Sequence, residues 1–203
     1  MRRQLLIDQI PLITLVVLGA IMALLTDRFL SPVNLTNVLV QAAVITVIAM
    51  GMTFVILGGG FDLSVGSVVA LSGCVGAAVM MKGGIIFGIA AGVGAGALVG
   101  LANGVAVTVL RVNPFIATLG TMVLVRGVVF LITNGEQVPV DGVLPKSFLD
   151  FGVERLLGIH YLVWVPAVLL ALLSWVLGMT PYGRSVYATG GNREAAYLSG
   201  IRV

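Results

Sequence analysis

The chain has 203 residues, of which 59% are hydrophobic and 9% are charged, and its mean hydropathy is +1.15. Soluble domains usually carry about 25% charged residues, so this composition excludes a soluble globular domain and predicts an all-α polytopic membrane protein. Eleven Lys and Arg against eight Asp and Glu leave a net charge of +3. This charge is too small and too dispersed to indicate a nucleic-acid partner, and in a membrane chain basic residues report orientation instead.

Six charge-poor windows, each near the roughly 20 residues that cross a bilayer as a helix, predict six transmembrane spans. Arg2 and Arg3 precede the first window. No small-residue cleavage site follows its long apolar run, so we interpret it as a retained signal anchor. The transmembrane region is expected over residues 1–180, with spans at about 10–25, 35–57, 63–81, 84–110, 114–133 and 161–179, and residues 181–203 form a polar terminal segment.

The second and third spans are separated by the segment GGGFDLSVGS, residues 58–67. Its three glycines predict a helix break, after which Ser64 and Ser67 are expected to cap the first amides of the next helix. A carboxylate at the bilayer centre costs about 2.5 to 3.5 kcal/mol, so Asp62 is expected at an interface or beside a wet cavity. A tight loop with a capping aspartate is the more common arrangement, and a discontinuous transporter helix is the alternative.

The fourth span carries a ladder of glycines at every fourth position. Such small-xxx-small spacing allows helices to approach closely, either as static packing or as a sliding contact. Asn103, near the end of the ladder, adds a polar group that could bond across helices or line a path. The predicted helix-packing residues are Gly84, Gly88, Gly92, Gly96, Gly100 and Gly104.

The fifth span begins at NPFIATLGTM, residues 113–122. Asn113 followed by Pro114 is typical of a helix start. Arg126 falls near the middle of this span, where its side chain cannot easily reach an interface, so it is expected to face protein or water. Asp62 is one conceivable partner for it.

A polar stretch, residues 134–158, is expected to be the longest loop, and it gathers Glu136, Asp141, Asp150 and Glu154. The terminal segment GRSVYATGGNREAAYLSGI, residues 183–201, predicts a short surface helix that Asn192 caps and Gly200 ends. A cytoplasmic amino terminus places six basic residues inside (Arg2, Arg3, Arg111, Arg184, Arg193, Arg202) against four outside (Arg28, Lys82, Lys146, Arg155). The terminal helix is therefore expected in the cytoplasm.

Three motifs together carry a family resemblance: GGGFDLSVGS, NPFIATLGTM followed by Arg126-Gly127, and YGRSVYATGGNREAAYLSGI. In this order they resemble the permease subunits of monosaccharide ABC importers of the ribose, xylose, arabinose and galactose group. The resemblance implies a bacterial inner-membrane fold of about ten helices. It also implies a second permease copy, a cytoplasmic ATPase that binds ATP and Mg, a periplasmic sugar-binding protein, and no cofactor or metal in this chain.

In this family the segment that matches residues 190–201 is the coupling helix, which docks on the ATPase. The resemblance assigns coupling to Gly190, Gly191, Asn192, Glu194, Ala195, Ala196, Ser199 and Gly200. It implies alternating access driven by ATP, in which the permease itself does no bond chemistry. Polar and aromatic groups suited to an uncharged polyol are expected along the translocation pathway: Asp62, Ser64, Asn103, Asn113, Phe115 and Arg126. Family members continue with further membrane helices beyond the point that matches Val203, so a fragment or a truncated reading frame is expected.

Other classes remain alternatives. An intramembrane enzyme needs a nucleophile and base or a metal cluster, but the chain has one His, one Cys and no HExxH or GxSxG motif. An ion-coupled secondary transporter would explain a broken helix with Asp62 and Arg126, but it leaves the terminal docking helix unexplained. Within the ABC class, a branched-chain amino acid permease is the nearest competitor.

Overall fold

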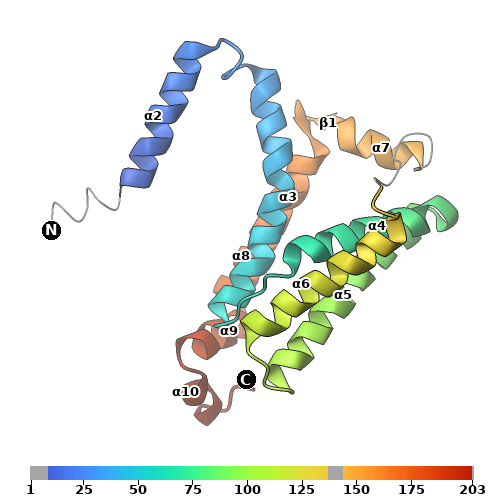
Figure 1. Cartoon of the computed structure of the whole chain (residues 1–203). Helices are drawn as coiled ribbons and strands as arrows, with labels where there is room; N and C mark the ends of the chain where they lie inside the picture. Colours follow the sequence, from blue (N-terminus) through green and yellow to red (C-terminus); the bar gives the residue numbers. More distant parts are fainter. Residues whose placement is uncertain (1–8, 137–143, 203) are drawn as a thin grey trace.

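The computed structural model describes residues 9–136 and 144–202, and these residues form an almost entirely helical chain (Figure 1). The residues of two sequence observations, Arg2 with Arg3 and the acidic Asp141, lie outside the described ranges. The elements in chain order are α2 (Ile10–Leu25), α3 (Pro32–Leu57), α4 (Val65–Gly83), α5 (Ile85–Thr108), α6 (Pro114–Thr133), α7 (Lys146–Val153), β1 (Arg155–Leu156), β2 (Ile159–His160), α8 (Tyr161–Met179), α9 (Pro181–Gly191) and α10 (Arg193–Leu198).

Five helices in the described ranges are long and apolar enough to cross a membrane, namely α3, α4, α5, α6 and α8, and α2 is a shorter apolar helix of 16 residues. The prediction of an all-α polytopic membrane protein is therefore confirmed. α3 begins three residues before the expected span because Ser31 accepts a hydrogen bond from the Asn34 amide and Pro32 occupies the first turn.

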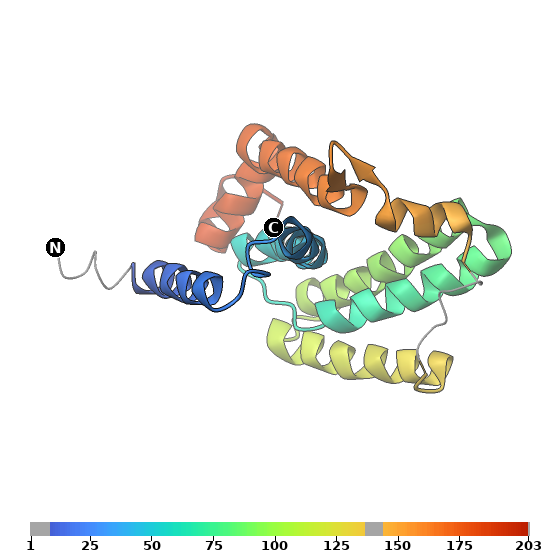
Figure 2. The same ribbon diagram turned by 90° about the horizontal axis from the view of Figure 1, so that it is seen from above.

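The helices form two groups that are joined at the segment between α3 and α4. α4, α5 and α6 pack on one another, whereas α3 packs on α8 and α9. Figure 2 shows the two groups side by side from above, with α2 standing apart from both. α7 and the hairpin β1–β2 connect α6 to α8 at the end far from α9 and α10 (Figure 1).

The expectation of a plain loop over residues 134–158 is wrong for its second half. That half contains the short helix α7 and the hairpin, in which Arg155 pairs with His160. α7 is held against α8 by Phe151, whose ring stacks on Tyr161 with centroids 5.4 Å apart. The polar composition of residues 134–158 as a whole did not indicate this helix, because its apolar residues lie on one face.

The most extensive helix contact is between α4 and α5, and the glycine ladder makes part of it. A side chain added at Gly92 would lie 2.8 Å from the Ser72 carbonyl oxygen, and one at Gly88 would meet Met80 and lie 2.8 Å from the Gly76 carbonyl oxygen. These backbones approach closely because neither glycine carries a side chain. Gly96 contacts Ser72 in the same groove.

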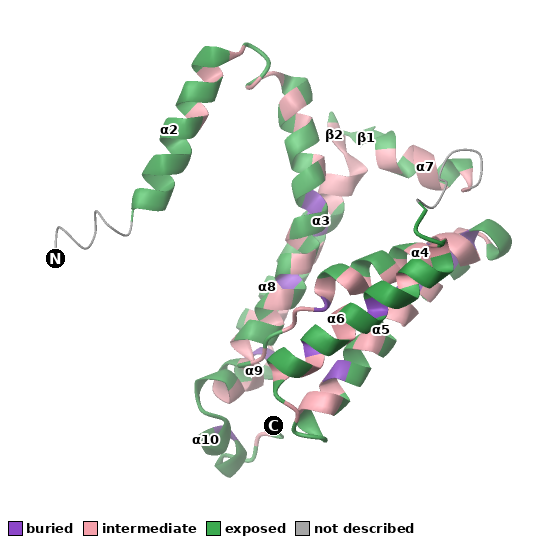
Figure 3. Cartoon of the chain, in the orientation of Figure 1, coloured by how far each residue is buried: buried purple, intermediate pink, exposed green. Residues whose placement is uncertain are grey.

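Few residues are buried in this fold (Figure 3), and large apolar side chains such as Leu24, at 89% exposed, cover its outer faces. That pattern is expected for helices whose surroundings are lipid, because lipid tails are as apolar as leucine. The buried apolar residues are Ala43, Met50, Met80, Val125 and Ala196. Three buried residues are polar, Ser64, Asn103 and Thr118, and two of these belong to one site.

Candidate functional site at the break between α3 and α4

The glycine triplet ends α3 in a defined turn. The Gly60 amide donates to the Val55 carbonyl at 2.8 Å and the Gly59 amide donates to the Ile56 carbonyl at 3.0 Å. This pair of bonds is a Schellman motif, and it requires the left-handed conformation that Gly59 adopts at φ +80°. The turn provides hydrogen-bond donors for two of the last carbonyls of α3, and it changes the direction of the chain toward α4.

Asp62 follows this turn and anchors the start of α4. Its Oδ1 accepts two hydrogen bonds from Ser64, one from the amide at 2.7 Å and one from the hydroxyl at 2.6 Å. Ser64 is fully buried, with 0% of its surface exposed. Asp62 is half-buried, and Ser64 supplies both of the donors that stabilise its Oδ1.

The hydrogen bonds continue from Ser64 across two further helices. The amide Nδ2 of Asn103, on α5, donates to the Ser64 hydroxyl at 2.9 Å, and the Thr121 hydroxyl, on α6, donates to Asn103 Oδ1 at 2.6 Å. We call Asp62, Ser64, Asn103 and Thr121 the polar relay. Every bond in it donates toward the carboxylate, an arrangement in which successive hydrogen bonds polarise and strengthen one another.

A second bond joins α4 to α6 beside the relay, because the Ser67 hydroxyl donates to the Met122 carbonyl at 2.9 Å. The expectation that Ser64 and Ser67 cap α4 is therefore wrong. Ser64 occupies the cap position but its side chain makes no capping bond. The Ser67 hydroxyl bonds to Met122 on α6, and the Ser64 hydroxyl bonds to Asp62 and to Asn103 on α5.

Two cavities adjoin Asp62. One, of about 310 Å³, lies between α3 and the start of α4 and includes Ser64 in its wall, and the other, of about 200 Å³, includes Asn103 and Thr118. Asp62 is half-buried, and among the described residues its second oxygen, Oδ2, is neither bonded nor fully enclosed. That oxygen is the site's available acceptor.

The last glycines of the ladder border these cavities. An added side chain at Gly100 or Gly104 would meet nothing within 4 Å, and both residues line the cavity beside Asn103. Gly84 lies in the turn before α5 with φ +87°, also without a neighbour at that distance. The packing role expected for these three glycines stays a prediction, whereas Gly88, Gly92 and Gly96 contact α4.

The remaining sequence-predicted pathway residues lie away from the relay. Asn113 uses its side chain to accept from the Phe115 amide at 2.9 Å, so the expected start of α6 at Asn113-Pro114 is confirmed. Phe115 is exposed at that end of α6. Arg126 is also exposed, and because it lies five residues after Thr121 it points about 140° away from the relay. Within the described ranges, Asp62 is thus bonded to Ser64 and not to Arg126.

The terminal segment forms two helices. Asn192 caps α10 by accepting from the Ala195 amide at 3.0 Å, and Gly200 ends it at φ +82°, so the predicted capped helix is confirmed. Our reading of the sequence did not predict α9, which brings Gly190 against the end of α3. Ala196 is buried, whereas the other seven residues proposed for coupling are exposed: Gly190, Gly191, Asn192, Glu194, Ala195, Ser199 and Gly200.

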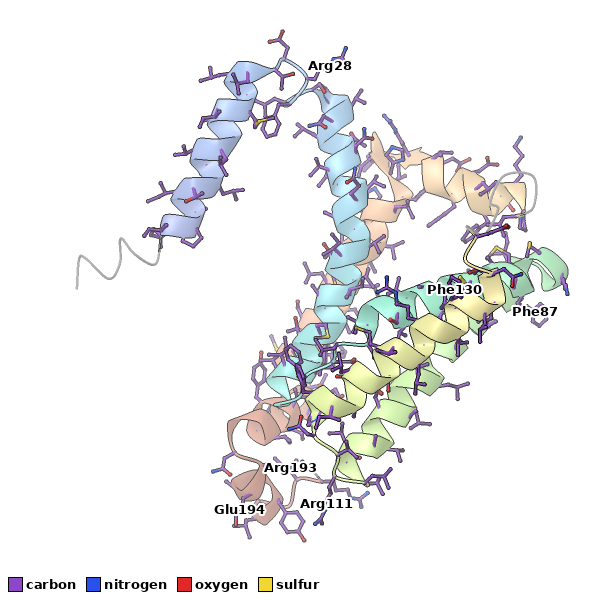
Figure 4. The ribbon with its side chains drawn as sticks, in the orientation of Figure 1. Arg28, Phe87, Arg111, Phe130, Arg193 and Glu194 are labelled. Atoms are coloured by element: carbon purple, nitrogen blue, oxygen red, sulfur yellow. The ribbon has the colours of Figure 1, made fainter. Side chains whose placement is uncertain are left out.

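Charged residues mark the two ends of the helices. Figure 4 shows Arg111, Arg193 and Glu194 at one end and Arg28 at the other. The terminal helices α9 and α10 therefore share an end with the loop between α5 and α6. Among the described residues no group of three or more His, Cys, Asp or Glu side chains is placed to hold a metal ion.

Sequence reasoning missed Thr121, which completes the relay. Thr121 lies within the quoted motif NPFIATLGTM, but a threonine in a membrane helix usually bonds to its own backbone, as Thr118 does to the Pro114 carbonyl at 2.8 Å. Only the partner on α5 distinguishes Thr121 from Thr118. No local signal could have revealed that partner.

Five apolar helices long enough to span a bilayer, with a polar relay and cavities between them, define a multi-pass membrane protein with a site inside the helix bundle. Residues 34–203 match the family described as "Branched-chain amino acid transport system / permease component". The chain therefore belongs to this permease family. No solved structure matches it.

Several curated relatives are sugar permeases. The Ribose import permease protein of Escherichia coli is 42% identical over 200 residues, which cover 98% of this chain and 62% of that protein. The Ribose import permease protein of Bacillus subtilis is 42% identical over 199 residues, which cover 95% and 60%. The L-arabinose ABC transporter permease protein of Azospirillum brasilense is 40% identical over 188 residues, which cover 92% and 55%. The chain spans less than two thirds of the length of these relatives.

Proposed function

We propose that this chain forms part of the translocation pathway of an ABC importer for a monosaccharide, as a permease that does no bond chemistry itself. The observation that carries the proposal is the capped helix α10, which stands exposed beyond the ends of the membrane helices. The names of the relatives refer to ribose and arabinose, which supports a monosaccharide as the solute. These names favour a sugar over the branched-chain amino acids of the family description. A bacterial inner membrane, a second permease copy and a substrate-binding protein belong to the same proposal.

We propose further that α9 and α10 lie in the cytoplasm, with the amino terminus on the same side. The end that carries Arg111 and Arg193 would then be the inner one, and the end with Arg28 the outer one. Short loops with more Lys and Arg face the cytoplasm in membrane proteins. In this orientation the cavities beside Asp62 lie nearer the inner surface, because Thr121 is only the eighth residue of α6.

The docking surface for an ATPase subunit would be the exposed side of α10 and its flanking turns. Asn192, Glu194, Ala195 and Ser199 are exposed there, whereas Ala196 is 4% exposed and holds α10 to the rest of the chain. Glu194 in the first turn is stabilised by the positive end of the helix. Ala196 would thus support the surface without touching the partner. ATP and Mg would bind the ATPase and not this chain.

Along the pathway, Asp62 would accept hydrogen bonds from sugar hydroxyls through Oδ2. The cavity of about 310 Å³ is at the small end of the range for ligand sites, which suits a single sugar ring. Asn103 and Ser64 would hold the carboxylate in place. Asn113, Phe115 and Arg126 would line other parts of the path, because all three are exposed in the described structure.

The test is co-expression of the chain with the ABC-type ATPase subunit of its own genome. An Ala195→Trp substitution places a large ring on the docking surface, and we expect it to lower ATPase recovery at least tenfold. Ala90→Trp, on the exposed face of α5, is the matched control and should leave recovery unchanged. Uptake of labelled ribose or arabinose into vesicles then tests the substrate. Equal recovery with both variants would refute the docking surface.

A further inference from the structure

The two helix groups are joined between α3 and α4 by the segment 58–64, which contains the glycine turn and reaches into the polar relay. On the α3 side, the group contains α8, α9 and the attached α10. On the α4 side, it contains the relay residues Asn103 and Thr121. The chain also joins the groups through α7 and the hairpin, at the end far from α9 and α10, so residues 58–64 are the connection that lies beside α9 and the relay.

The turn Gly58–Gly60 and the end of α3 contact the backbone of α9. A side chain built on Gly190 would overlap the Leu57 carbonyl oxygen, and one built on Gly59 would lie 3.8 Å from the Gly190 Cα. A stacked pair, Phe54 on α3 and Tyr182 on α9 with centroids 6.4 Å apart, joins the same two helices at a second point. α9 thus holds the end of α3 at two points.

The other end of the segment is held by the relay. Only Phe61 separates Gly60 of the turn from Asp62, and Asp62 is bonded twice to Ser64. A displacement of the turn therefore reaches the carboxylate over a very short length of chain. The glycine turn itself is bonded to the end of α3 by the amides of Gly59 and Gly60, so it moves together with that end.

We propose that Gly190 and the turn Gly58–Gly60 form a joint that carries movement of α9 and α10 to Asp62 and the polar relay. In this joint Gly190 and Gly59 are positioning residues. They act through the carboxylate, which they move relative to the cavities. The inference of a joint rests on the structure alone, whereas its use in transport rests on the function proposed above.

The first experiment needs no partner subunit. In the full chain with Cys74→Ala, spin labels at Tyr187→Cys on α9 and Leu124→Cys on α6, both exposed, report the distance between the two groups by pulsed electron resonance. Gly190→Ala must push α9 away from Leu57, so we expect the distance to shift by about 2 Å or to broaden clearly. The matched control Gly178→Ala, which meets nothing within 4 Å, should leave it unchanged. An unchanged distance in Gly190→Ala would overturn the joint.

A second variant tests the same contact in case Gly190→Ala does not fold. Gly59→Asn keeps the left-handed conformation that the turn requires, because asparagine tolerates it, but it adds a side chain facing Gly190. We expect a distance change of the same kind. If Gly59→Asn folds and its distance distribution matches the parent, the proposal fails.

The second experiment measures coupling. With the ATPase subunit bound, Gly59→Asn, which lies outside the residues proposed for coupling, should keep ATPase recovery within twofold of the parent but lower the solute moved per ATP hydrolysed at least tenfold. A merely structural role would lower recovery and transport together and leave their ratio unchanged, and that result would overturn the role in transport. If the parent chain binds no ATPase, the proposed function fails, and the distance experiment alone decides whether the joint exists.

Discussion

Thr121→Val isolates one bond of the polar relay with almost no change of shape. The substitution removes the donor to Asn103 Oδ1, which lies 2.6 Å away, and leaves that oxygen without a partner in a residue that is 6% exposed. Hydrogen bonds between membrane helices contribute about 0.6 kcal/mol on average and about 1.7 at most. A buried acceptor left unpaired costs about 1 to 3 kcal/mol. We therefore expect the free energy of unfolding to fall by about 1 to 2 kcal/mol.

The matched control is Thr108→Val, the same change on α5. The Thr108 hydroxyl is exposed and donates only to the Gly104 carbonyl of its own helix, so the expected loss is below about 0.5 kcal/mol. The assay is reversible unfolding in mixed micelles, followed by circular dichroism. Combining Thr121→Val with Asn103→Leu should show a coupling energy of about 0.5 kcal/mol or more. Equal losses in the two threonine variants, or additive losses in the double variant, would refute the relay.

Three further predictions test other parts of the structure. Gly92→Ala should destabilise the chain by about 1 to 3 kcal/mol in the same assay, because its methyl group meets the α4 backbone, while Gly94→Ala, with open space around it, should not. In intact cells, with the native cysteine removed, a membrane-impermeant thiol reagent should label Leu157→Cys and not Asn192→Cys, and the reverse pattern would exclude a cytoplasmic α10. Asp62→Asn keeps an oxygen acceptor for its hydroxyl partner, so protein yield should be unchanged while labelled sugar uptake falls at least tenfold; uptake at the parent rate would remove the carboxylate from the pathway.

Caps and helix starts were predictable because they are local. Asn113 with Pro114, and Asn192 with Gly200, each satisfy backbone groups within a few residues, and both pairs lie where the sequence pattern indicated. The same reasoning failed for Ser64, whose hydroxyl oxygen can accept either from a local amide or from a partner on another helix. It accepts from Asn103 on α5 and donates to the neighbouring Asp62 carboxylate.

The regular spacing of the glycine ladder does not predict which of its glycines contact another helix. Spacing alone treats all its glycines alike, but Gly88, Gly92 and Gly96 lie against α4 whereas Gly100 and Gly104 border the cavity near Asp62. The difference arises because the chain enters α4 only at Val65, so α4 has no residue opposite the last part of α5. The starting point of one helix thus decides the role of residues on another.

The amino-acid sequence by itself determined that the chain is a membrane protein and approximately where its helices run. Lipid offers no hydrogen-bond partners, so each crossing must be a long apolar helix. Such a helix can be recognised from a run of consecutive apolar residues. Only the tertiary structure decided that Asn103 bonds to Ser64, that Thr121 bonds to Asn103 and that Gly190 meets Leu57. Those contacts join residues far apart in the chain, and they depend on how helices pack, which lipid-facing composition does not specify.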